Sequence, residues 1–490
     1  MDDALIYLNF LLQASQNPAL DQSIYTFAQD NPGAISDFKI EFLAKWLIIK
    51  SRFTSPIILS PSELNWQAYL ELSMLYDQID DPIIHDPNFK NRNPVEVFVR
   101  MQYQQLQGQH RLALQSFGSA YLLFYETAAR VATSVRYNIP ERFRQLSGIS
   151  IEQFMHLGFI FLASKAGPYG AIGTISQEYL NKAKMQGLDI LTDENIQRFL
   201  DMTSCDHEAF RQVAIRSPYP VSDPEFVLYE FNPLKKFPLL QVHYDRWVAP
   251  NPALIIDRVT LGIYYDLLDA DSTQFTQSFG TIFEEYVGDL LKSVYPETIV
   301  LREKVYGQPQ KRGPADWVVI EGDTAILFEC KSFIPNLNFV SISSQADIEQ
   351  YARRVANAIR QTHQHINEIQ AGEPQLQEFT GSVFKIVVLT VGRIQTVNTV
   401  FFKQEIDTIL AAKGISNLSY TVLSLQEFEL LLSLVERDVL LTELLDRLEG
   451  ENQGEALTPY QEMLSQNATP SLVAQKGEEI ITFFRNHQVS

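Results

Sequence analysis

Apolar residues recur at helical spacing through the first part of the chain. Three stretches place an apolar residue every three or four positions, namely Ala4–Leu12, Ile40–Leu47 and Tyr69–Tyr76. The segment Val95–Val135 continues this period with few helix-breaking residues. The pattern therefore predicts a large, mainly α-helical domain over residues 1–222. This domain carries no recognisable catalytic motif, and we expect it to serve as a scaffold or to recognise a partner.

The pattern changes where prolines enter the sequence between Pro218 and Pro224. Short apolar runs then follow at Phe226–Phe231 and Leu239–Tyr244, and runs of this length between turn residues are typical of strands. Helical spacing returns over Leu254–Leu268. We therefore assign residues 223–274 to a short strand pair and one helix that link two larger parts.

Strand-like and helical patterns alternate from about residue 275 to residue 435. A helical stripe over Phe279–Leu291 comes first. The expected strands are Ile299–Tyr306, Trp317–Ile320, Ala325–Phe328, Ser382–Thr390 and Ser419–Ser424, and a long helix is expected over Gln345–Ile369. This order predicts an α/β core in which a mixed sheet is flanked by helices on both faces.

An acidic helical tail is expected over residues 436–490. The acidic side chains begin slightly earlier, with Glu427 and Glu429, and a last helix is predicted over Ser471–Arg485. Such charges usually cover the solvated face of a helix. We therefore expect these carboxylates to lie at the surface.

Two apolar strands on either side of Gly322-Asp323 predict a β-hairpin with a two-residue turn. With these turn residues, Asp316 faces Glu329, and facing residues point to the same side of a hairpin. Lys331 lies two residues beyond Glu329 and shares that side. The register therefore gathers an aspartate, a glutamate and a lysine at one end of an apolar hairpin.

This combination of side chains suits metal-dependent phosphodiester hydrolysis. Two facing carboxylates repel each other, so a cation between them is expected. Carboxylate oxygens around an open site suit Mg²⁺, and Mn²⁺ is expected to substitute for it. A neighbouring lysine can orient the attacking water or stabilise negative charge on a phosphate.

Asp316, followed after the hairpin by Glu329, Cys330 and Lys331, resembles the motif of the PD-(D/E)xK nuclease superfamily, which includes restriction endonucleases. The sequence departs from the named motif because an alanine separates its proline from Asp316. The resemblance implies a restriction-endonuclease-like core over residues 275–435 and metal binding by Asp316 and Glu329. It also implies that the carbonyl of Cys330 is a further ligand and that Lys331 positions the water or the phosphate.

A glutamate on the preceding helix is a further candidate. Gly280, Glu284 and Gly288 are spaced by four and form one row beside the apolar stripe. Glycine costs a helix up to about 1 kcal/mol relative to alanine, so another backbone or a ligand is expected to approach there. Superfamily members often carry a glutamate on this helix that joins the metal site. We assign this role to Glu284, with Glu285 as the alternative; both could also be solvated.

Four basic residues are candidates for binding nucleic acid. Lys311 and Arg312 precede Asp316 in an expected loop, where they would hold a phosphate or simply form an exposed turn. Arg353 and Arg354 lie on the predicted long helix and would contact backbone phosphates.

Composition narrows the functional classes. The chain has 490 residues, a formal net charge of −20 and two cysteines. So few cysteines fit a reducing cytoplasm, and no apolar run reaches the roughly 18 residues of a membrane span. The acidic balance argues against a protein that coats nucleic acid. A nuclease remains compatible with it, because bound metal ions supply positive charge at the scissile phosphate.

The expected protein is a Mg²⁺-dependent endonuclease that acts on DNA in the cytoplasm. By analogy with superfamily members that carry accessory domains, its setting would be prokaryotic restriction or antiphage defence. Cutting both strands of a duplex commonly needs two active sites, so a homodimer is expected, and the helical domain would bind a protein partner. The alternatives are an RNase, or a sensor or assembly component whose nuclease-like fold binds without cleaving.

Overall fold

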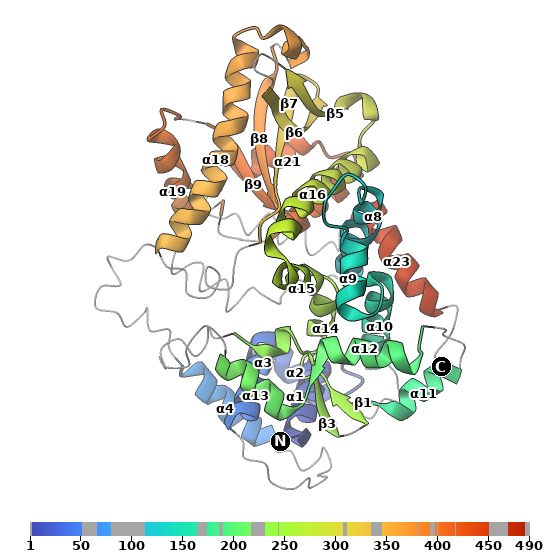
Figure 1. Ribbon diagram of the computed structural model, residues 1–490. Helices are drawn as coiled ribbons and strands as arrows, with labels where there is room; N and C mark the ends of the chain where they lie inside the picture. The colour runs from blue at the N-terminus through green and yellow to red at the C-terminus, as the bar shows by residue number, and fades with distance from the viewer. Residues whose placement is uncertain are drawn as a thin grey trace.

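Two β-sheets joined by helices are formed by the residues that the structure describes. In this computed structural model a five-stranded sheet lies at one end of the molecule and a four-stranded sheet at the other (Figure 1). The described residues are 2–50, 66–79, 113–163, 174–185, 190–216, 231–243, 245–306, 311–334, 345–379, 381–392, 397–398, 400–416, 418–449 and 469–485. The predicted combination of a large helical region with a sheet region is confirmed.

Helices dominate the described residues as far as Arg216. They are α1 (Asp2–Ala14), α2 (Gln22–Asp30), α3 (Asp37–Lys50), α4 (Trp66–Asp77), α7 (Ala113–Tyr121), the π-helix η3 (Leu122–Thr127), α8 (Ala128–Arg130), α9 (Ile139–Ser147), α10 (Ile151–Ala163), α11 (Gln177–Met185), α12 (Asp193–Thr203) and α13 (His207–Arg216). The three stretches with helical spacing correspond to α1, α3 and α4. Residues 95–112 of the predicted long helix lie outside the described residues.

A small mixed sheet forms within and just after this helical region. Its strands are β1 (Thr174–Ser176), β2 (Ser204–Cys205), β3 (Leu239–His243) and β4 (Arg246–Val248), in the order β1-β4-β3-β2. The predicted strand Leu239–Tyr244 corresponds to β3, whose antiparallel partner is β4. The other predicted strand, residues 226–231, lies outside the described residues except at its last position. Strands as short as β1 and β2 leave no alternating pattern, so the sequence predicts only helix there.

The prediction of a single helix over Leu254–Leu268 is wrong, because the chain bends at Thr260. Two helices form instead, α14 (Ala253–Val259) and α15 (Gly262–Ala270). The buried guanidinium of Arg258 donates to both carboxylate oxygens of Asp266, at 2.7 and 3.1 Å. Eight residues of straight helix would separate these positions by about 12 Å along the axis, so the ion pair favours the bend.

The larger sheet has the strand order β5-β6-β7-β8-β9. Its strands are β5 (Val300–Tyr306), β6 (Lys311–Glu321), β7 (Thr324–Lys331), β8 (Val383–Thr390) and β9 (Tyr420–Ser424). Strands β5 to β7 are antiparallel, and β7 to β9 are parallel. The parallel strands are joined through helices, as their geometry requires. The predicted order of strands and helices is confirmed.

Helices cover both faces of this sheet, which explains why its central strands are apolar on both sides. The helices are α18 (Gln345–Gln370) and α19 (Val400–Ala411) on one face, and α16 (Ser272–Val294) and α20 (Leu425–Val435) on the other. Val318 and Leu327 are buried towards α18. Trp317 and Phe328 are buried towards α16 and α20. Figure 1 shows α16 running between the sheet and the N-terminal helices.

The acidic C-terminal region is packed into the fold. Its described helices are α21 (Leu441–Glu449), against β9 and α20, and α23 (Ser471–Arg485), against α7. The expectation that Glu427 and Glu429 are solvated is wrong, since they are 5% and 1% exposed. Glu427 forms a capping box with Ser424 at the start of α20. Glu429 binds α7 and α16 through hydrogen bonds.

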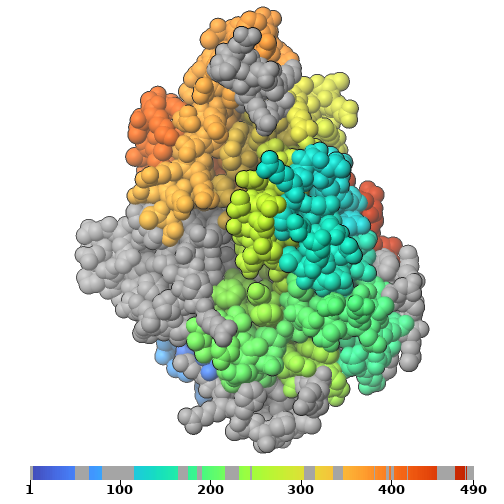
Figure 2. Space-filling view, viewed as in Figure 1, coloured from blue at the N-terminus to red at the C-terminus, as the bar shows by residue number. Residues whose placement is uncertain are grey.

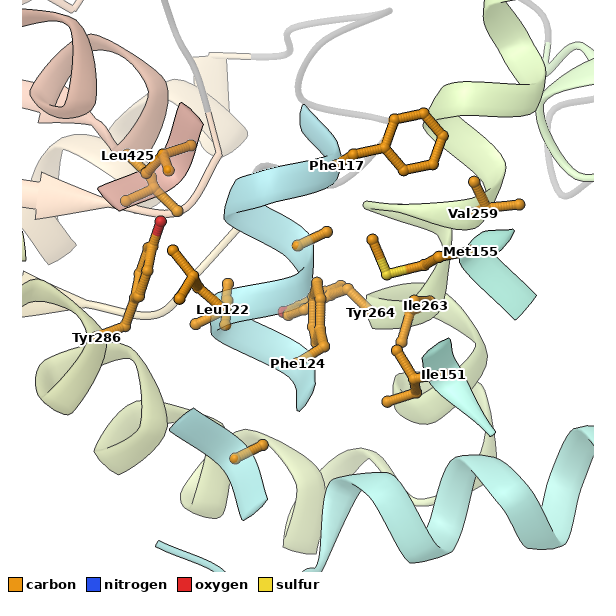
Figure 3. Close-up of a cluster of buried hydrophobic side chains, with 14 of the residues drawn as sticks. Phe117, Leu122, Phe124, Ile151, Met155, Val259, Ile263, Tyr264, Tyr286 and Leu425 are labelled. Atoms are coloured by element: carbon orange, nitrogen blue, oxygen red, sulfur yellow. The ribbon is translucent and has the colours of Figure 1, made fainter. Parts of the chain in front are cut away.

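One hydrophobic cluster unites the N-terminal helices with the larger sheet. Figure 3 shows Phe124 beside Tyr264 of α15, Phe117 beside Val259 of α14, and Tyr286 of α16 beside Leu122. Phe124 stacks on Phe279 of α16 with ring centroids 5.6 Å apart. Aromatic pairs of this kind add to the free energy of burial. Helix α16 is therefore held by both parts of the molecule.

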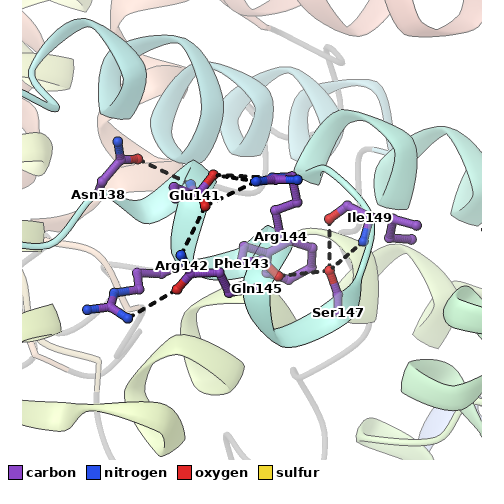
Figure 4. A network of polar contacts seen from close by, with 8 residues as sticks. All are labelled: Asn138, Glu141, Arg142, Phe143, Arg144, Gln145, Ser147 and Ile149. Atoms are coloured by element: carbon purple, nitrogen blue, oxygen red, sulfur yellow. Dashed lines mark hydrogen bonds and ion pairs between the residues drawn. The ribbon is translucent and has the colours of Figure 1, made fainter.

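Helix α9 illustrates how local polar contacts end a helix. The Asn138 side chain accepts the backbone N–H of Glu141 at 3.2 Å, and Gly148 ends the helix with φ of 79°. Glu141 also binds Arg144 and Gln145 on the exposed side (Figure 4). Helix α9 packs beside α15, and the two lie side by side on the face shown in Figure 2.

No single helix among the described residues is long and apolar enough to cross a membrane. Helices α9 and α10 meet the length and composition criteria only as a pair, with a bend of 58° between them.

Candidate active site

The β6–β7 hairpin has the predicted register. Val318 pairs with Leu327 and Ile320 with Ala325. Gly322 has φ of 61°, a positive value at the first turn position that favours glycine. The last strand pair on this side is Trp317 with Phe328. Asp316 lies one residue beyond it and makes its contact through its side chain.

Asp316 is held at the end of the hairpin by the main chain of β7. Its Oδ2 accepts the backbone N–H of Cys330 at 2.6 Å. Burial raises the pKa of Asp316 to about 8, and the negative charges of Glu329 and Glu284 add to this effect. The Cys330 N–H and the Lys331 ammonium act in the opposite direction. This carboxyl therefore takes up a proton more readily than an ordinary aspartate.

Lys331 pairs with Glu329 at the same end of the hairpin. Its Nζ lies 2.6 Å from Oε1 of Glu329, and the two side chains are 31% and 12% exposed. Burial lowers the pKa of Lys331, but the carboxylates of Glu329 and Asp316 outweigh it and leave the pKa raised. The side chain is therefore an ammonium group that faces two carboxyl groups.

The structure distinguishes Glu284 from Glu285. Glu284 is partly buried, and its charge raises the pKa values of both Asp316 and Cys330. Glu285 instead pairs with Arg130 at 3.5 Å and with Arg302. Of these neighbouring glutamates, Glu284 is thus the one that shares the electrostatic environment of Asp316.

Cys330 contributes its main chain to the site and its side chain to the core. The residue is 6% exposed and pairs with Leu389 of β8. Burial raises the pKa of its thiol well above the usual value, and the charges of Asp316 and Glu284 contribute. The thiol is therefore neutral. The resemblance assigns the backbone carbonyl oxygen of this residue, not the thiol, as a metal ligand.

The predicted basic residues differ in their surroundings. The guanidinium of Arg354 lies 5.6 Å from the ring centroid of Phe333, two residues after Lys331. Arg353 pairs with Glu349 at 3.0 Å on the exposed side of α18. Of the two arginines, Arg354 is therefore the one that contacts the segment following Lys331.

Lys311 and Arg312 lie in a strand, so the expectation of a loop is wrong at these positions. They pair with Tyr306 and Val305 of β5 in the extended part of β6. The longer strand arises because β5 offers pairing partners as far as Tyr306. Their side chains lie outside the described part of the structure.

The donor atoms available suit a hard divalent cation. Two carboxylates, Asp316 and Glu329, and the carbonyl of Cys330 come from one hairpin, and Mg²⁺ prefers such oxygen ligands. Burial is the main cause of the raised pKa of Asp316, and a cation would offset the repulsion from Glu329 and Glu284 that adds to it. Within the described residues, no three His, Cys, Asp or Glu side chains are already arranged around a common metal position. The fit therefore depends on the main-chain carbonyl as well as on the side chains.

The sequence does not indicate the contacts that hold α16 beside the site. The Trp317 indole N–H donates to the carbonyl oxygen of Glu284 at 2.7 Å. Arg130 of α8 and Arg302 of β5 both pair with Glu285, the next residue of α16. The glycine row of α16 was a partial signal, because it predicts a close approach without naming the residue that makes it.

Comparisons with known proteins add no assignment. No family model matches the chain, and neither a curated protein nor a solved structure matches it.

Proposed function

We propose that this protein is a Mg²⁺-dependent endonuclease that hydrolyses phosphodiester bonds in DNA. The observation that carries the proposal is the shared charge environment of Glu284, Asp316, Glu329 and Lys331 at one end of the β6–β7 hairpin. Carboxyl groups gathered at one partly buried site repel one another, and side chains with pKa values perturbed in this way cluster at functional sites. The mixed sheet with helices on both faces agrees with the superfamily resemblance.

Each residue has a distinct role in this proposal. Asp316, Glu329 and the carbonyl of Cys330 would hold Mg²⁺, with Glu284 completing or supporting the site. Bound Mg²⁺ supplies Lewis-acid polarisation of the scissile phosphate. Lys331, held by Glu329 at 2.6 Å, donates hydrogen bonds to the attacking water or to a phosphate oxygen.

DNA is the proposed partner, and Arg354 is placed to contact its backbone. This guanidinium is exposed and stacks on Phe333, which keeps it close to the strand end that carries Lys331. The proposal extends, by analogy alone, to a cytoplasmic restriction or antiphage effector that acts as a homodimer. The N-terminal helices would bind a protein partner. RNA remains the alternative substrate.

A second candidate is a sensor or assembly component that binds without cleaving. The net charge of −20 favours it, because an acidic surface repels nucleic acid and so disfavours a protein that must turn over many nucleic-acid substrates. The carboxyl groups of the site also have partners within the protein. Lys331 pairs with Glu329, and the backbone N–H of Cys330 donates a hydrogen bond to Asp316.

The test is cleavage of plasmid DNA, single-stranded DNA and RNA by the purified full chain with Mg²⁺, Mn²⁺ or EDTA. Asp316→Asn and Lys331→Ala should each lower the cleavage rate by about 100-fold or more. Asp323→Asn, an exposed aspartate at the turn of the same hairpin, is the matched control and should cleave normally. Equal cleavage by all four proteins would exclude the proposal. A wild type that binds DNA and cuts no substrate would favour the second candidate.

A further inference from the structure

Trp317 joins the strand that carries Asp316 to the helix that carries Glu284. Its indole N–H donates to the main-chain carbonyl oxygen of Glu284 at 2.7 Å, and the residue is 2% exposed. A helical carbonyl already accepts an N–H four residues ahead, and its second lone pair can accept another donor. The Trp317 side chain therefore holds the turn of α16 that carries Glu284 against β6, directly after Asp316.

Gly288 makes this contact possible. A Cβ atom at this position would lie 2.0 Å from Cζ2 of Trp317, so no other residue fits without moving the indole. Gly280, in the same row, differs: a Cβ there would lie 3.6 Å from the Ser332 hydroxyl, an ordinary contact. A close approach is thus found at Gly288, but the approaching group is the ring of Trp317 and not the backbone or ligand that was expected.

Two cations contact the same ring. Nζ of Lys292 lies 4.8 Å from the centroid of the Trp317 ring, and Cζ of Arg302 lies 5.6 Å from it. Arg302 also pairs with Glu285 of α16. Cation–π contacts are worth about 0.5–1 kcal/mol each at exposed sites, and here they restrain the indole from β5 and α16 together.

We propose that Trp317 is a positioning residue, which sets the separation of the Glu284 and Asp316 carboxyl groups and needs Gly288 to do so. This inference rests on the proposed function, because a fixed separation matters only if both carboxyl groups serve one site. The hydrogen bond resists sliding and rotation of α16, and either movement would carry Glu284 away from Asp316. Groups that orient metal ligands typically change metal affinity 10- to 100-fold when they are removed.

The first experiment compares Trp317→Phe with wild type. This variant keeps an aromatic ring and loses the N–H donor. The Mg²⁺ concentration for half-maximal cleavage should rise about tenfold, while the KM for DNA stays constant. A merely structural role would lower the folded fraction, and hence kcat, without moving the Mg²⁺ dependence. Trp247→Phe, at a buried tryptophan of the smaller sheet, is the matched control and should leave both parameters unchanged.

A second experiment does not require activity. Tryptophan indoles are labelled with ¹⁵N, and Mn²⁺ is added in substoichiometric amounts as a paramagnetic probe. The Trp317 resonance should broaden first, whereas those of Trp46, Trp66 and Trp247 should persist. In Gly288→Ala the Trp317 resonance should shift, because the added methyl group displaces the ring.

A double variant separates packing from positioning. Adding Trp317→Leu to Gly288→Ala removes the clash and should restore thermal stability, but the Mg²⁺ requirement should stay high. Normal Mg²⁺ dependence in active Trp317→Phe would overturn the positioning role and leave the nuclease function intact. A wild type that neither cleaves nor shows selective Mn²⁺ broadening would overturn both.

Discussion

The phenolic O–H of Tyr286 donates a 2.7 Å hydrogen bond to Oε1 of Glu429 in a site closed to solvent. The other carboxylate oxygen accepts from Gln115 at 2.8 Å and from Ser119 at 2.7 Å, both on α7. Burial raises the pKa of Glu429. Helix α16, which carries Glu284, and the N-terminal helix α7 therefore bind one buried carboxyl group, so both parts of the molecule determine where α16 lies.

Tyr286→Phe should destabilise the fold. The change leaves a buried carboxyl oxygen without its donor, which costs about 2 kcal/mol for a hydrogen bond to a charged group. Urea unfolding followed by circular dichroism measures the loss. Tyr25→Phe, at a half-buried tyrosine of α2, is the control and should have little effect. Equal stability of the two variants would mean that the Glu429 site contributes nothing.

Glu284→Gln and Glu285→Gln should behave differently although the residues are adjacent. Glu284→Gln removes a charge that acts on Asp316 and should reduce cleavage about tenfold or more. Glu285→Gln only weakens pairing with Arg130 and Arg302, which should cost at most about 1 kcal/mol of stability and leave the cleavage rate unchanged. Cleavage rates at saturating Mg²⁺ decide the matter. The reverse ranking would assign the site to Glu285.

Glu321→Ala should loosen α21. The Glu321 carboxylate accepts the backbone N–H groups of Leu441 and Thr442 at 3.1 and 2.9 Å, and the Tyr295 hydroxyl at 2.6 Å. Losing this cap should cost about 1–2 kcal/mol. Hydrogen exchange should then be faster in α21 than in wild type, whereas Asp323→Asn should leave it unchanged. Uniform exchange across all three proteins would contradict the capping role.

The free energy of unfolding should fall as the pH drops below about 6.5, in part because of His156. Burial lowers the pKa of this side chain to about 4. Between these values the unfolded chain binds a proton that the folded protein excludes, so stability is retained above pH 6.5 and lost towards pH 4. The contribution at pH 5 is on the order of 2 kcal/mol. Urea unfolding at pH 7 and pH 5 should show a smaller difference for His156→Gln; an identical difference would refute the assignment.

Local pattern predicts most of the larger sheet and part of the site. The turn at Gly322 and the apolar runs beside it define the hairpin register, because side-chain alternation and turn length leave one pairing. That register places Asp316, Glu329 and Lys331 at one end of the hairpin, where the structure has them. The spacing of Glu284 along its helix likewise identifies a row that faces the strands.

Charge alone did not predict burial. Glu429 and Glu285 resemble solvated residues in the sequence, yet one is enclosed by α7 and α16 and the other is paired with Arg130 and Arg302. Their partners come from elements far away along the chain. The break at Thr260 also involves distant partners, since Arg258 pairs with Asp266 and donates to the carbonyl oxygens of Met202 and Lys236 as well.

The amino-acid sequence by itself determined the order of strands and helices, the hairpin register and the identity of the charged residues at its end. These features depend on periodicity and turn chemistry between near neighbours. Only the tertiary structure decided that Trp317 would anchor the turn at Glu284, that Gly288 would receive its ring, and which glutamate would face Asp316. Such contacts join residues about thirty positions apart, and their geometry is fixed by how helices pack on a sheet.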